Sequence, residues 1–421
     1  MFSRKNNEPI ACVLLWIILS GRWDDWPQQK TIHAKQADPV NNITFHIAET
    51  EAEREQIYRL RYEIYVEEMH IFGSVADHER RMLFGHNDEQ SRLLYAKCGD
   101  ELIGSLRLNL GKDAAFSEEL ETTYNLCRFR PTVKDEQLLV LTRFMVKKEF
   151  RGGPVAYRMI EEVAKICVTE QIEMAVCDCQ PHLIRYYQRM GFRSYDCNIY
   201  NDGEFGIMIP LAFAIRDLAY LSAIRSPLRK PLDQPVDDLE EVHRITALLG
   251  TPAVRGVAEM DASETSWIVD QLTCDKASDL NCAKLFNGMS PSEIMPIISK
   301  GYLLSLGKED LMIRRGQQTA TVFMVLSGEL DVYKNGKRIH RTRAGEVIGE
   351  LGVILNARRS ADVYVASEKA VVLSMDESKL NKRLNARTPS AAQMLHNLCQ
   401  ILAHKVANRL EESPKTMMIA A

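Results

Sequence analysis

The chain has 421 residues, of which 46% are hydrophobic and 26% charged, and its formal net charge is −4. This composition is typical of a globular protein with two or three domains, and it excludes a polycationic protein that binds nucleic acid through its overall charge. The ten cysteines are scattered. Because Cys177-Asp178-Cys179 lacks the spacing of a zinc site, we expect reduced thiols in a cytosolic protein and no bound metal.

Residues 1–42 are predicted to form an N-terminal extension and linker. Arg4 and Lys5 precede an apolar run at residues 10–19, which is too short to cross a bilayer comfortably. No small-residue cleavage site follows the run, so a secretory signal peptide is not indicated. We expect a cytoplasmic protein, and the alternative is attachment to a membrane surface through the apolar run.

Residues 43–225 alternate between strand and helix patterns, which indicates a mixed α/β domain. The strand predicted at 137–147 is apolar almost throughout, as is typical of a central strand. We expect strands at residues 43–47, 91–97, 101–110, 137–147 and 172–179 and within 193–210, and helices at residues 52–69, 154–169 and 181–190.

Three features of this domain indicate the handling of a phosphate-bearing thioester. The central strand leads through Gly152 and Gly153 into a helix that begins near Pro154. The free N–H groups of such a helix start bind phosphate, and Arg151 adds positive charge. The parallel strand at 172–179 can diverge from the central strand and leave a slot for a pantetheine arm. Tyr187 follows, and its hydroxyl could protonate a leaving thiolate.

The segments 151–156 and 187–192 resemble the GNAT superfamily of N-acyltransferases, although Pro154 stands where that family usually has glycine. Three further motifs, beginning at Arg61, Gly104 and Thr142, resemble those of acyl-homoserine-lactone synthases and N-acyl amino acid synthases. This resemblance covers residues 43–225. Lactone synthases carry an acid at the position of Val140, so we expect amide formation without lactone closure.

The resemblance implies an N-acyltransferase that takes its acyl group from an acyl carrier protein or acyl-CoA and passes it to a small-molecule amine or a protein lysine. The implied catalytic residues are Tyr187 and Arg143; the implied substrate-binding residues are Arg61, Arg107, Thr142 and Phe144; and the implied acyl-donor-binding residues are Arg151, Gly152, Gly153 and Val146. The general base is not identifiable: Asp88 and Glu89 are weak candidates, and an ordered water is the alternative.

Structural interpretations of these residues stay open at this point. Arg61 could lie on a solvated helix face, and Arg143 could form a purely structural ion pair, since a buried arginine needs a partner. Tyr187 could be an aromatic residue of the core.

Residues 226–280 are predicted to form a helical linker, and the chain changes character in the segment 281–382. Short β runs there are separated by glycines at 316, 328, 336 and 345, which is the pattern of a small antiparallel β-roll. Within it, Gly349-Glu350-Leu351 is followed eight residues later by Arg359-Ser360-Ala361. A carboxylate and a guanidinium at this separation suit a ribose hydroxyl and a cyclic phosphate.

Residues 285–380 resemble cyclic nucleotide-binding domains of the catabolite-activator and protein-kinase-regulatory type. The resemblance implies that Glu350 accepts a hydrogen bond from the ribose 2′-hydroxyl and that Arg359 binds the phosphate. Gly349 would let the backbone approach the ribose, and Leu351, Ser360 and Ala361 belong to the same cassette. We expect cAMP as the ligand, with cGMP as the alternative. An internal Glu350–Arg359 salt bridge in a roll that binds nothing is the structural interpretation.

Residues 383–421 are predicted to form one long amphipathic helix and a tail. The helix could cover the ligand or form the seam of a homodimer. No helix-turn-helix follows the roll, so we expect a cAMP-regulated N-acyltransferase. The alternatives are a cAMP-regulated protein lysine acetyltransferase that uses acetyl-CoA, and a sensor or scaffold without catalysis.

Overall fold

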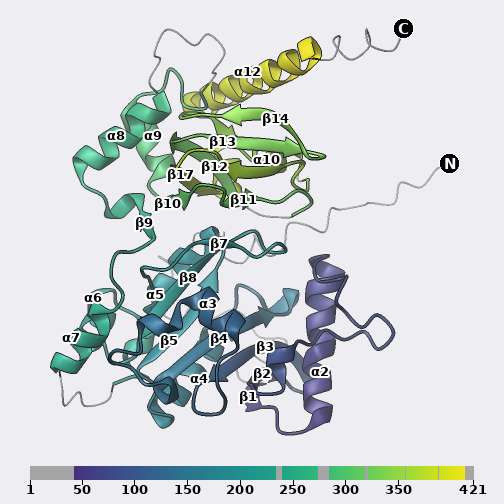
Figure 1. Ribbon diagram of the computed structural model, residues 1–421, viewed down its shortest axis with the longest axis vertical. Coiled ribbons are helices and arrows are strands. Elements are labelled where there is room, and N and C mark those ends of the chain that lie inside the picture. The colour runs from purple at the N-terminus through teal and green to yellow at the C-terminus, as the bar shows by residue number, and fades with distance from the viewer. Residues whose placement is uncertain are drawn as a thin grey trace, which may run out of the picture. The chain divides into compact units, whose positions relative to one another are not determined.

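The computed structural model describes residues 42–233, 239–273, 284–317, 321–355, 357–386 and 388–412 (Figure 1). Contacts divide the chain into two compact units: the first contains the residues up to Cys179, Leu183–Asn198 and Pro210–Pro252, and the second contains Gln180–His182, Ile199–Ile209 and the residues from Ala253 onward. The predicted extension at 1–42, apart from Asn42, and the tail at 413–421 lie outside the described residues. Among the residues that are described, no helix is long and apolar enough to cross a membrane.

An eight-stranded mixed sheet is the framework of the N-terminal half. Its order is β1-β2-β3-β4-β5-β8-β6, and β7 pairs with β8. The strands are β1 (Ile43–Ile47), β2 (Arg92–Cys98), β3 (Glu101–Leu110), β4 (Leu138–Val146), β5 (Met174–Cys179), β6 (Arg193–Ser194), β7 (Tyr200–Asn201) and β8 (Ile207–Ala214). The helices are α2 (Glu51–Arg61), α3 (Glu118–Tyr124), α4 (Val155–Thr169), α5 (Ile184–Met190), α6 (Leu218–Ala223) and α7 (Leu239–Ala247). β4 and β5 pair in parallel, so the mixed α/β fold is as the sequence predicts.

Helix α4 is amphipathic and packs its apolar stripe against this sheet (Figure 1). The stripe consists of buried side chains three or four residues apart, a spacing that places them on one helix face; they are Val155, Met159, Ile160, Val163 and Cys167. This packing fixes the start of α4, and with it the Gly152-Gly153 turn, next to the end of β4.

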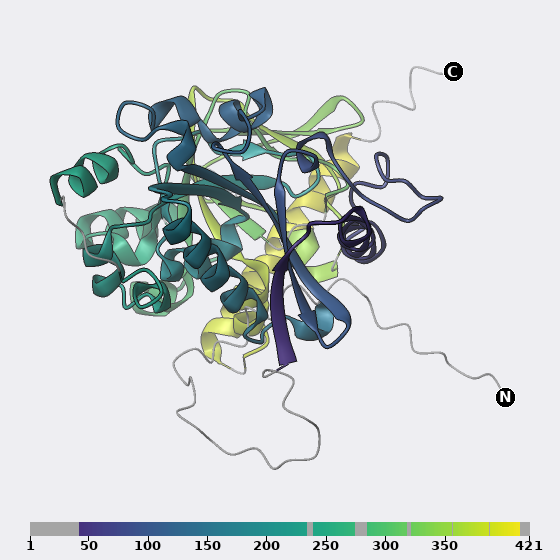
Figure 2. The same cartoon turned by 90° about the horizontal axis from the view of Figure 1, so that it is seen from below.

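The helix predicted at residues 52–69 forms in two parts. α2 begins at a capping box in which the Thr50 and Glu53 side chains satisfy each other's backbone N–H groups. It ends at Arg61, and Tyr62–Glu68 continue as a π-helical segment. Single π-helical turns are frequent at functional sites, and the apolar spacing of so short a segment does not distinguish it from an α-helix. Figure 2 shows α2 nearly end-on beside the strands.

Strand β4 contains a β-bulge at the predicted arginine motif. The register with β3 shifts between Ser105↔Met145 and Arg107↔Thr142, so β4 has one extra residue. Arg143 there has a φ of 56°, in the left-handed region that a non-glycine residue adopts at a cost of about 1–3 kcal/mol. A bulge redirects the side chains of its strand, and here it redirects Arg143.

The second unit is an antiparallel β-roll of two sheets. One has the order β15-β12-β17-β10-β9 and the other β11-β16-β13-β14. The strands are β9 (Val254–Gly256), β10 (Tyr302–Gly307), β11 (Leu311–Ile313), β12 (Thr321–Ser327), β13 (Leu330–Lys334), β14 (Lys337–Thr342), β15 (Val347–Ile348), β16 (Asp362–Val365) and β17 (Lys369–Asp376). The helices are α8 (Ala262–Thr273), α9 (Pro291–Ile298), α10 (Glu350–Leu355), α11 (Glu377–Leu384) and α12 (Pro389–Glu412).

The structure differs from the prediction of a helical linker at 226–280 in one place. α7 and α8 lie in it, but Val254–Gly256 forms the edge strand β9, which pairs antiparallel with β10. A three-residue strand is too short to show a periodic pattern. Residues 234–238 and 274–280 of the linker lie outside the described residues.

Helix α12 is anchored to the roll through the first half of its length. Met394, Leu398 and Ile401 belong to a hydrophobic cluster with side chains of α8, α9, β12 and β17. The buried amide of Asn397 donates to the carbonyl oxygens of Leu285 and Asn287, at 3.0 and 2.8 Å. Apolar burial and a paired polar group together hold this part of the helix in one register.

Replacement of Tyr195 tests the core of the first unit. Its hydroxyl donates to the Tyr124 carbonyl at 2.7 Å, and its side chain is fully buried. Tyr195→Phe removes the hydroxyl that donates to that carbonyl, so we expect a loss of about 0.5–1.5 kcal/mol in the free energy of unfolding. Urea denaturation followed by circular dichroism measures the loss. The partly exposed Tyr364 is the control, and equal midpoints for Tyr195→Phe and Tyr364→Phe would contradict the expectation.

Candidate functional site

Two predicted arginines from different elements pair with one carboxylate in the first unit, and a third lies near them. Arg61, at the end of α2, places Nη1 2.7 Å from Oδ2 of Asp88. Arg107 of β3 places Nη1 3.5 Å from Oδ1 of Asp88, and Arg143 of the β4 bulge is close enough to influence the pKa of Arg107. Arg61 and Asp88 are each only 1% exposed, so Arg61 does not lie on a solvated helix face.

Asp88 acts as the anionic centre of this cluster. Burial would raise the pKa of its carboxyl, but the charges of Arg61 and Arg107, with hydrogen bonds from Arg61 and the Gly85 N–H, lower the pKa overall. A carboxylate with a lowered pKa is a poor general base at neutral pH. Asp88 therefore suits the role of holding two guanidiniums in place, and a role as general base fits it poorly.

The cluster has more hydrogen-bond donors than its described neighbours can satisfy. Within the described part of the chain, Nε and Nη2 of Arg61 and Nη1 of Arg143 are buried without a hydrogen-bond partner. The Arg143 guanidinium lies over the Phe72 ring, 4.4 Å from its centroid, and 5.6 Å from that of Tyr65. Two guanidiniums paired with Asp88 and a third nearby, with donors of Arg61 and Arg143 unused, form a region that an anion would stabilise.

The other two predicted substrate-binding residues flank Arg143. The Thr142 hydroxyl accepts a hydrogen bond from Nε of Arg107 at 2.8 Å, which fixes the orientation of that guanidinium. Phe144 is half-buried beside the bulge. The structure thus brings Arg61, Arg107, Thr142 and Arg143 together, although none of them is adjacent to Asp88 in the sequence.

The predicted acyl-donor residues lie at the start of α4. Gly152 has a φ of 71°, and no side chain caps the helix after Pro154, so its first N–H groups suit a phosphate. Arg151, however, donates to the Glu68 carboxylate, with Nη2 2.7 Å from Oε2, and to the Val146 carbonyl at 2.6 Å. A phosphate would compete with Glu68 for this guanidinium, and donor binding here stays a prediction.

Tyr187 is buried among aromatic rings. Its ring centroid lies 5.5 Å from that of Phe192 and 5.6 Å from that of Tyr186. Burial raises the pKa of the Tyr187 hydroxyl well above its ordinary value, and the neighbouring thiols of Cys177 and Cys179 act in the same direction. A tyrosine hydroxyl is protonated at neutral pH in any case, and a raised pKa makes it a weaker proton donor, so its catalytic role gains no support from this burial and stays a prediction.

The predicted nucleotide residues of the second unit also converge. Gly349 has a φ of 89°, and a Cβ at this position would lie 2.4 Å from Nη1 of Arg359. That guanidinium donates from Nη1 to the Gly349 carbonyl at 2.9 Å and from Nη2 to the Thr321 carbonyl. Gly349 thus satisfies two requirements at once, a left-handed backbone and room for the arginine.

Opposite charges surround the buried Arg359 side chain. Burial lowers its pKa, while the carboxylates of Glu377 and Glu350 act in the opposite direction. Glu350 begins α10, and its Oε1 lies 2.7 Å from Nζ of Lys405 on α12. Ala361 is buried and Ser360 is exposed, while Leu351 is half-buried. The guanidinium and the carboxylate predicted to bind a cyclic nucleotide thus lie within one another's electrostatic reach.

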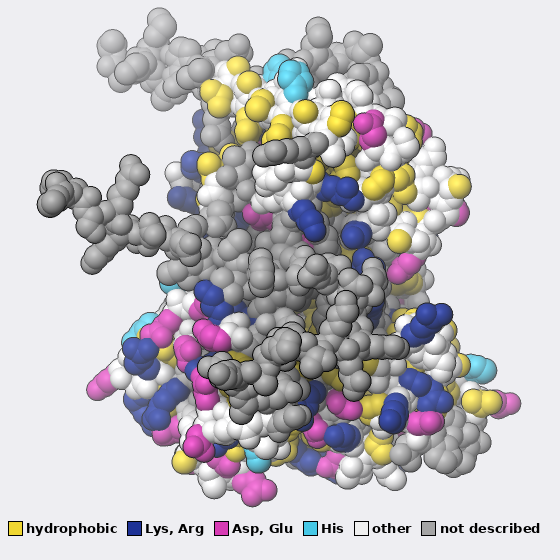
Figure 3. Space-filling view, turned by 180° about the vertical axis from the view of Figure 1, so that it is seen from behind, with side chains coloured by type: hydrophobic (Ala, Val, Ile, Leu, Met, Phe, Trp, Pro, Cys, Tyr) yellow, Lys and Arg dark blue, Asp and Glu magenta, His cyan; other side chains and the backbone are white. Residues whose placement is uncertain are grey.

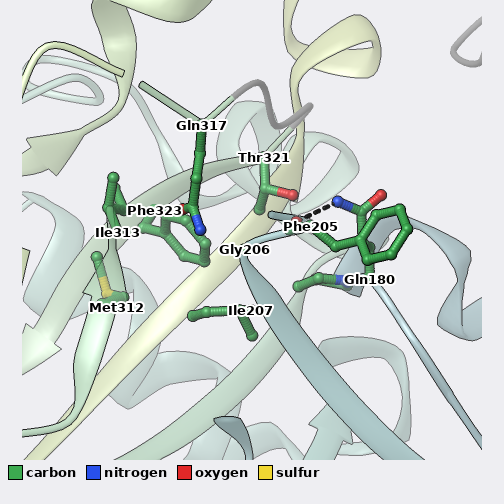
Figure 4. A pocket seen from close by; sticks show the side chains of 10 residues that line it. Gln180, Phe205, Gly206, Ile207, Met312, Ile313, Gln317, Thr321 and Phe323 are labelled. Carbon is green, nitrogen blue, oxygen red and sulfur yellow. Dashed lines mark hydrogen bonds between the residues drawn. The ribbon is translucent and has the colours of Figure 1, made fainter. Parts of the chain in front are cut away.

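A small apolar pocket adjoins the arginine in the second unit (Figure 4). It is bordered by Thr321, whose carbonyl accepts from Arg359, and by Gln317, whose carbonyl accepts from the Arg359 N–H at 2.8 Å. Its other lining residues are Gln180, Pro181, Phe205, Gly206, Ile207, Met312, Ile313 and Phe323.

Charged side chains are mixed on the surface. On the face shown in Figure 3, the described basic and acidic side chains are interspersed. Basic side chains of the hairpin β13–β14 are likewise close to acidic ones, since Arg341 pairs with Asp331 and Glu329. A nucleic-acid interface is expected to carry a basic stripe instead.

Two family models match the chain, one in each half. Residues 56–203 match the model described as N-acyl amino acid synthase FeeM, and residues 303–387 match the cyclic nucleotide-binding domain. The chain thus joins an N-acyl amino acid synthase region to a cyclic nucleotide-binding domain. The matches confirm the resemblance to N-acyl amino acid synthases and to cyclic nucleotide-binding domains that the motifs indicated.

Similar curated proteins match over short segments. Isozyme 1 of the cGMP-dependent protein kinase of Drosophila melanogaster is 26% identical over 130 residues, which cover 28% of this chain and 17% of that protein. The Pycsar effector protein XpPycTIR of Xanthomonas perforans is 24% identical over 116 residues, 28% of this chain and 36% of that protein. The chain therefore spans less than half the length of these two relatives.

Similar solved structures divide between the two halves. The CoA-dependent acyl-homoserine lactone synthase BjaI with SAM and isopentyl-CoA has a TM-score of 0.35 and 21% identity, covering 47% of this chain and 92% of that chain. The regulatory domain of Toxoplasma gondii PKA with cAMP has a TM-score of 0.26 and 22% identity, covering 30% and 46%. The assignment of the two regions rests on the family models.

Replacement of Asp88 tests its role in holding the arginines. Asp88→Asn keeps the shape of the side chain but leaves Arg61 and Arg107 without their anion. Removing one partner of a buried pair costs about 3–5 kcal/mol, so we expect a loss of this size in the free energy of unfolding by urea. Asp113→Asn, which breaks the more exposed pair with Arg92, is the control and should cost about 1 kcal/mol or less. Equal losses would contradict the assignment.

Replacement of Gly349 tests the nucleotide pocket. Gly349→Ala places a methyl group against the Arg359 guanidinium, so we expect nucleotide binding to weaken by at least about tenfold, or 1.4 kcal/mol. Gly336→Ala is a matched control, because its φ of 74° imposes a similar backbone strain while nothing lies within 4 Å of the added Cβ. Isothermal titration with cAMP and with cGMP measures the nucleotide affinity of the two variants. Equal weakening in the two variants would show that strain alone is responsible.

Proposed function

We propose that this chain is an N-acyltransferase that moves an acyl group from a thioester to the amine of a small, carboxylate-bearing acceptor, and that a cyclic nucleotide bound to the β-roll regulates it. The match of residues 56–203 to the N-acyl amino acid synthase model supports the reaction class. The observation that supports a carboxylate-bearing acceptor is the pairing of Arg61 and Arg107 with Asp88, with Arg143 nearby and donors of Arg61 and Arg143 unused.

An α-amino acid fits this cluster better than a protein lysine. The carboxylate of an amino acid would accept from the unused donors of Arg61 and Arg143 and offset the excess positive charge. A lysine side chain brings an amine without a carboxylate and leaves the guanidiniums unpaired. The protein lysine acetyltransferase alternative therefore does not account for the arginine cluster.

The reaction itself needs one bond to form and one to break. The neutral amine attacks the thioester carbonyl, the C–N bond of the amide forms and the C–S bond breaks, so the amine nitrogen loses one proton and the leaving thiolate gains one. Tyr187 is the proposed donor of the proton to the thiolate, and the proton that the amine loses restores its hydroxyl through water. The donor is an acyl-CoA or an acyl carrier protein, whose phosphate would lie at the start of α4, near Gly152 and Gly153.

The regulatory ligand is proposed to be cAMP, with cGMP as the alternative. Glu350 would accept from the ribose 2′-hydroxyl and Arg359 would bind the cyclic phosphate. To change the transferase from mostly inactive to mostly active, the ligand must bind the two states with affinities that differ by about 3–5 kcal/mol. A charge-assisted phosphate contact with several hydrogen bonds supplies a difference of this size.

Mass spectrometry of the reaction products tests the proposal. Purified full-length chain is incubated with the twenty amino acids, with acyl-CoA or acyl carrier protein as donor, and with or without cAMP or cGMP. We expect a product whose mass equals that of the amino acid plus the acyl group minus one hydrogen, in an amount that changes with the nucleotide. Acetylated protein lysines without that product would favour the lysine acetyltransferase, and no acyl transfer from any donor would favour a sensor without catalysis.

Replacement of Arg359 tests the regulatory half separately. Arg359→Ala removes the proposed phosphate ligand, so we expect the change in product yield on adding nucleotide to disappear. Arg338→Ala, on the exposed β13–β14 hairpin, should retain it. A response of equal size in Arg359→Ala and wild type would reject regulation through this pocket while leaving the transferase assignment intact.

A further inference from the structure

The ion pair between helix α12 and the nucleotide pocket leads beyond the proposed function. Nζ of Lys405 donates to Oε1 of Glu350 at 2.7 Å and to the Val347 carbonyl at 3.2 Å. Glu350 is 7% exposed, and it is the residue proposed to accept the ribose 2′-hydroxyl. Lys405 therefore already occupies the Glu350 carboxylate that the ribose 2′-hydroxyl of a cyclic nucleotide would need as its acceptor.

This contact also ties down the far half of α12. The first half is anchored by Met394, Leu398 and Asn397, but Ala403, His404 and Val406 are exposed. Among the described side chains of α12, Lys405 is the one nearest the C-terminus that forms a polar contact with the roll. Loss of the ion pair would leave the end of the helix with little to hold it.

We infer that Lys405 is an internal competitor of the nucleotide: the ribose hydroxyl and the Lys405 ammonium use the same Glu350 carboxylate, so ligand binding releases the distal part of α12. This inference rests on the proposed nucleotide site and specifies its regulation. By linkage, whatever weakens the docking of α12 tightens the nucleotide by the same factor. The arginine contact to the phosphate is not part of the competition, because Arg359 is held by the Gly349 and Thr321 carbonyls.

The ligand itself provides a test that separates the two contacts. The analogue 2′-deoxy-cAMP keeps the phosphate that Arg359 binds but lacks the hydroxyl that would displace Lys405. In the wild-type chain, we expect cAMP to speed hydrogen exchange in residues 402–412 and saturating 2′-deoxy-cAMP to leave it unchanged. Equal acceleration by both ligands would overturn the competition for Glu350.

Substitution of the lysine completes the test on the full-length chain. Lys405→Met keeps the aliphatic stem and removes the donor, so we expect about tenfold tighter binding of cAMP by isothermal titration, with 2′-deoxy-cAMP unchanged. A tenfold change corresponds to about 1.4 kcal/mol. Lys337→Met, which removes the same charge from the exposed end of β14, is the control and should bind like wild type.

Other outcomes are equally informative. Unchanged or weaker cAMP binding by Lys405→Met would overturn the inference, and weaker binding would make Lys405 a ligand contact. If neither wild type nor Lys405→Met binds cAMP or cGMP, the proposed nucleotide site fails and the competition with it. In that case, faster exchange of residues 402–412 in ligand-free Lys405→Met than in Lys337→Met would still measure the ion pair as a purely structural contact.

Discussion

The burial of guanidinium groups is the constraint on which both halves of this protein depend. A buried arginine must be paired with an anion or hydrogen-bonded, because transfer of an unpaired charge from water costs several kcal/mol or more. Arg61 meets this requirement through Asp88, and Arg359 meets it through two backbone carbonyls. In each case the backbone helps to position the partner: the Gly85 N–H donates to Asp88, and the left-handed conformation of Gly349 leaves room for Arg359.

The two solutions have different consequences for ligand binding. Around Asp88, Arg61 and Arg107 share one carboxylate while donors of Arg61 and Arg143 remain unused, so an anionic substrate would complete the charge balance. Around Arg359, neutral carbonyls occupy the guanidinium, and the carboxylates of Glu350 and Glu377 lie nearby. An anion that enters the second site would have to replace hydrogen-bond acceptors that the Arg359 guanidinium already has. The first site is therefore suited to hold a substrate and the second to respond to a ligand.

Much of this arrangement could be predicted from sequence, because the order of short motifs survives divergence. The strand at 43–47, the hairpin of β2 and β3, and the helix α4 were expected within one or two residues of where they lie. The grouping of Arg61, Arg107 and Arg143 followed from their resemblance to synthase motifs. The sequence offers Asp88 only as a weak candidate for the general base, because nothing in its local sequence indicates that two distant arginines converge on it.

What the sequence could not indicate is where the backbone departs from a regular element. Residues 138–146 have an unbroken strand pattern, yet an extra residue at the bulge gives Arg143 a left-handed conformation. The π-helical turn after Arg61 is hidden for the same reason, since one inserted residue barely alters the apolar spacing. Both irregularities adjoin the arginine cluster, and each costs conformational energy that the fold must offset. The regular packing of α4 against the sheet contributes stability that offsets this cost, so the β4 bulge and the π-helical segment can place charged side chains in the interior.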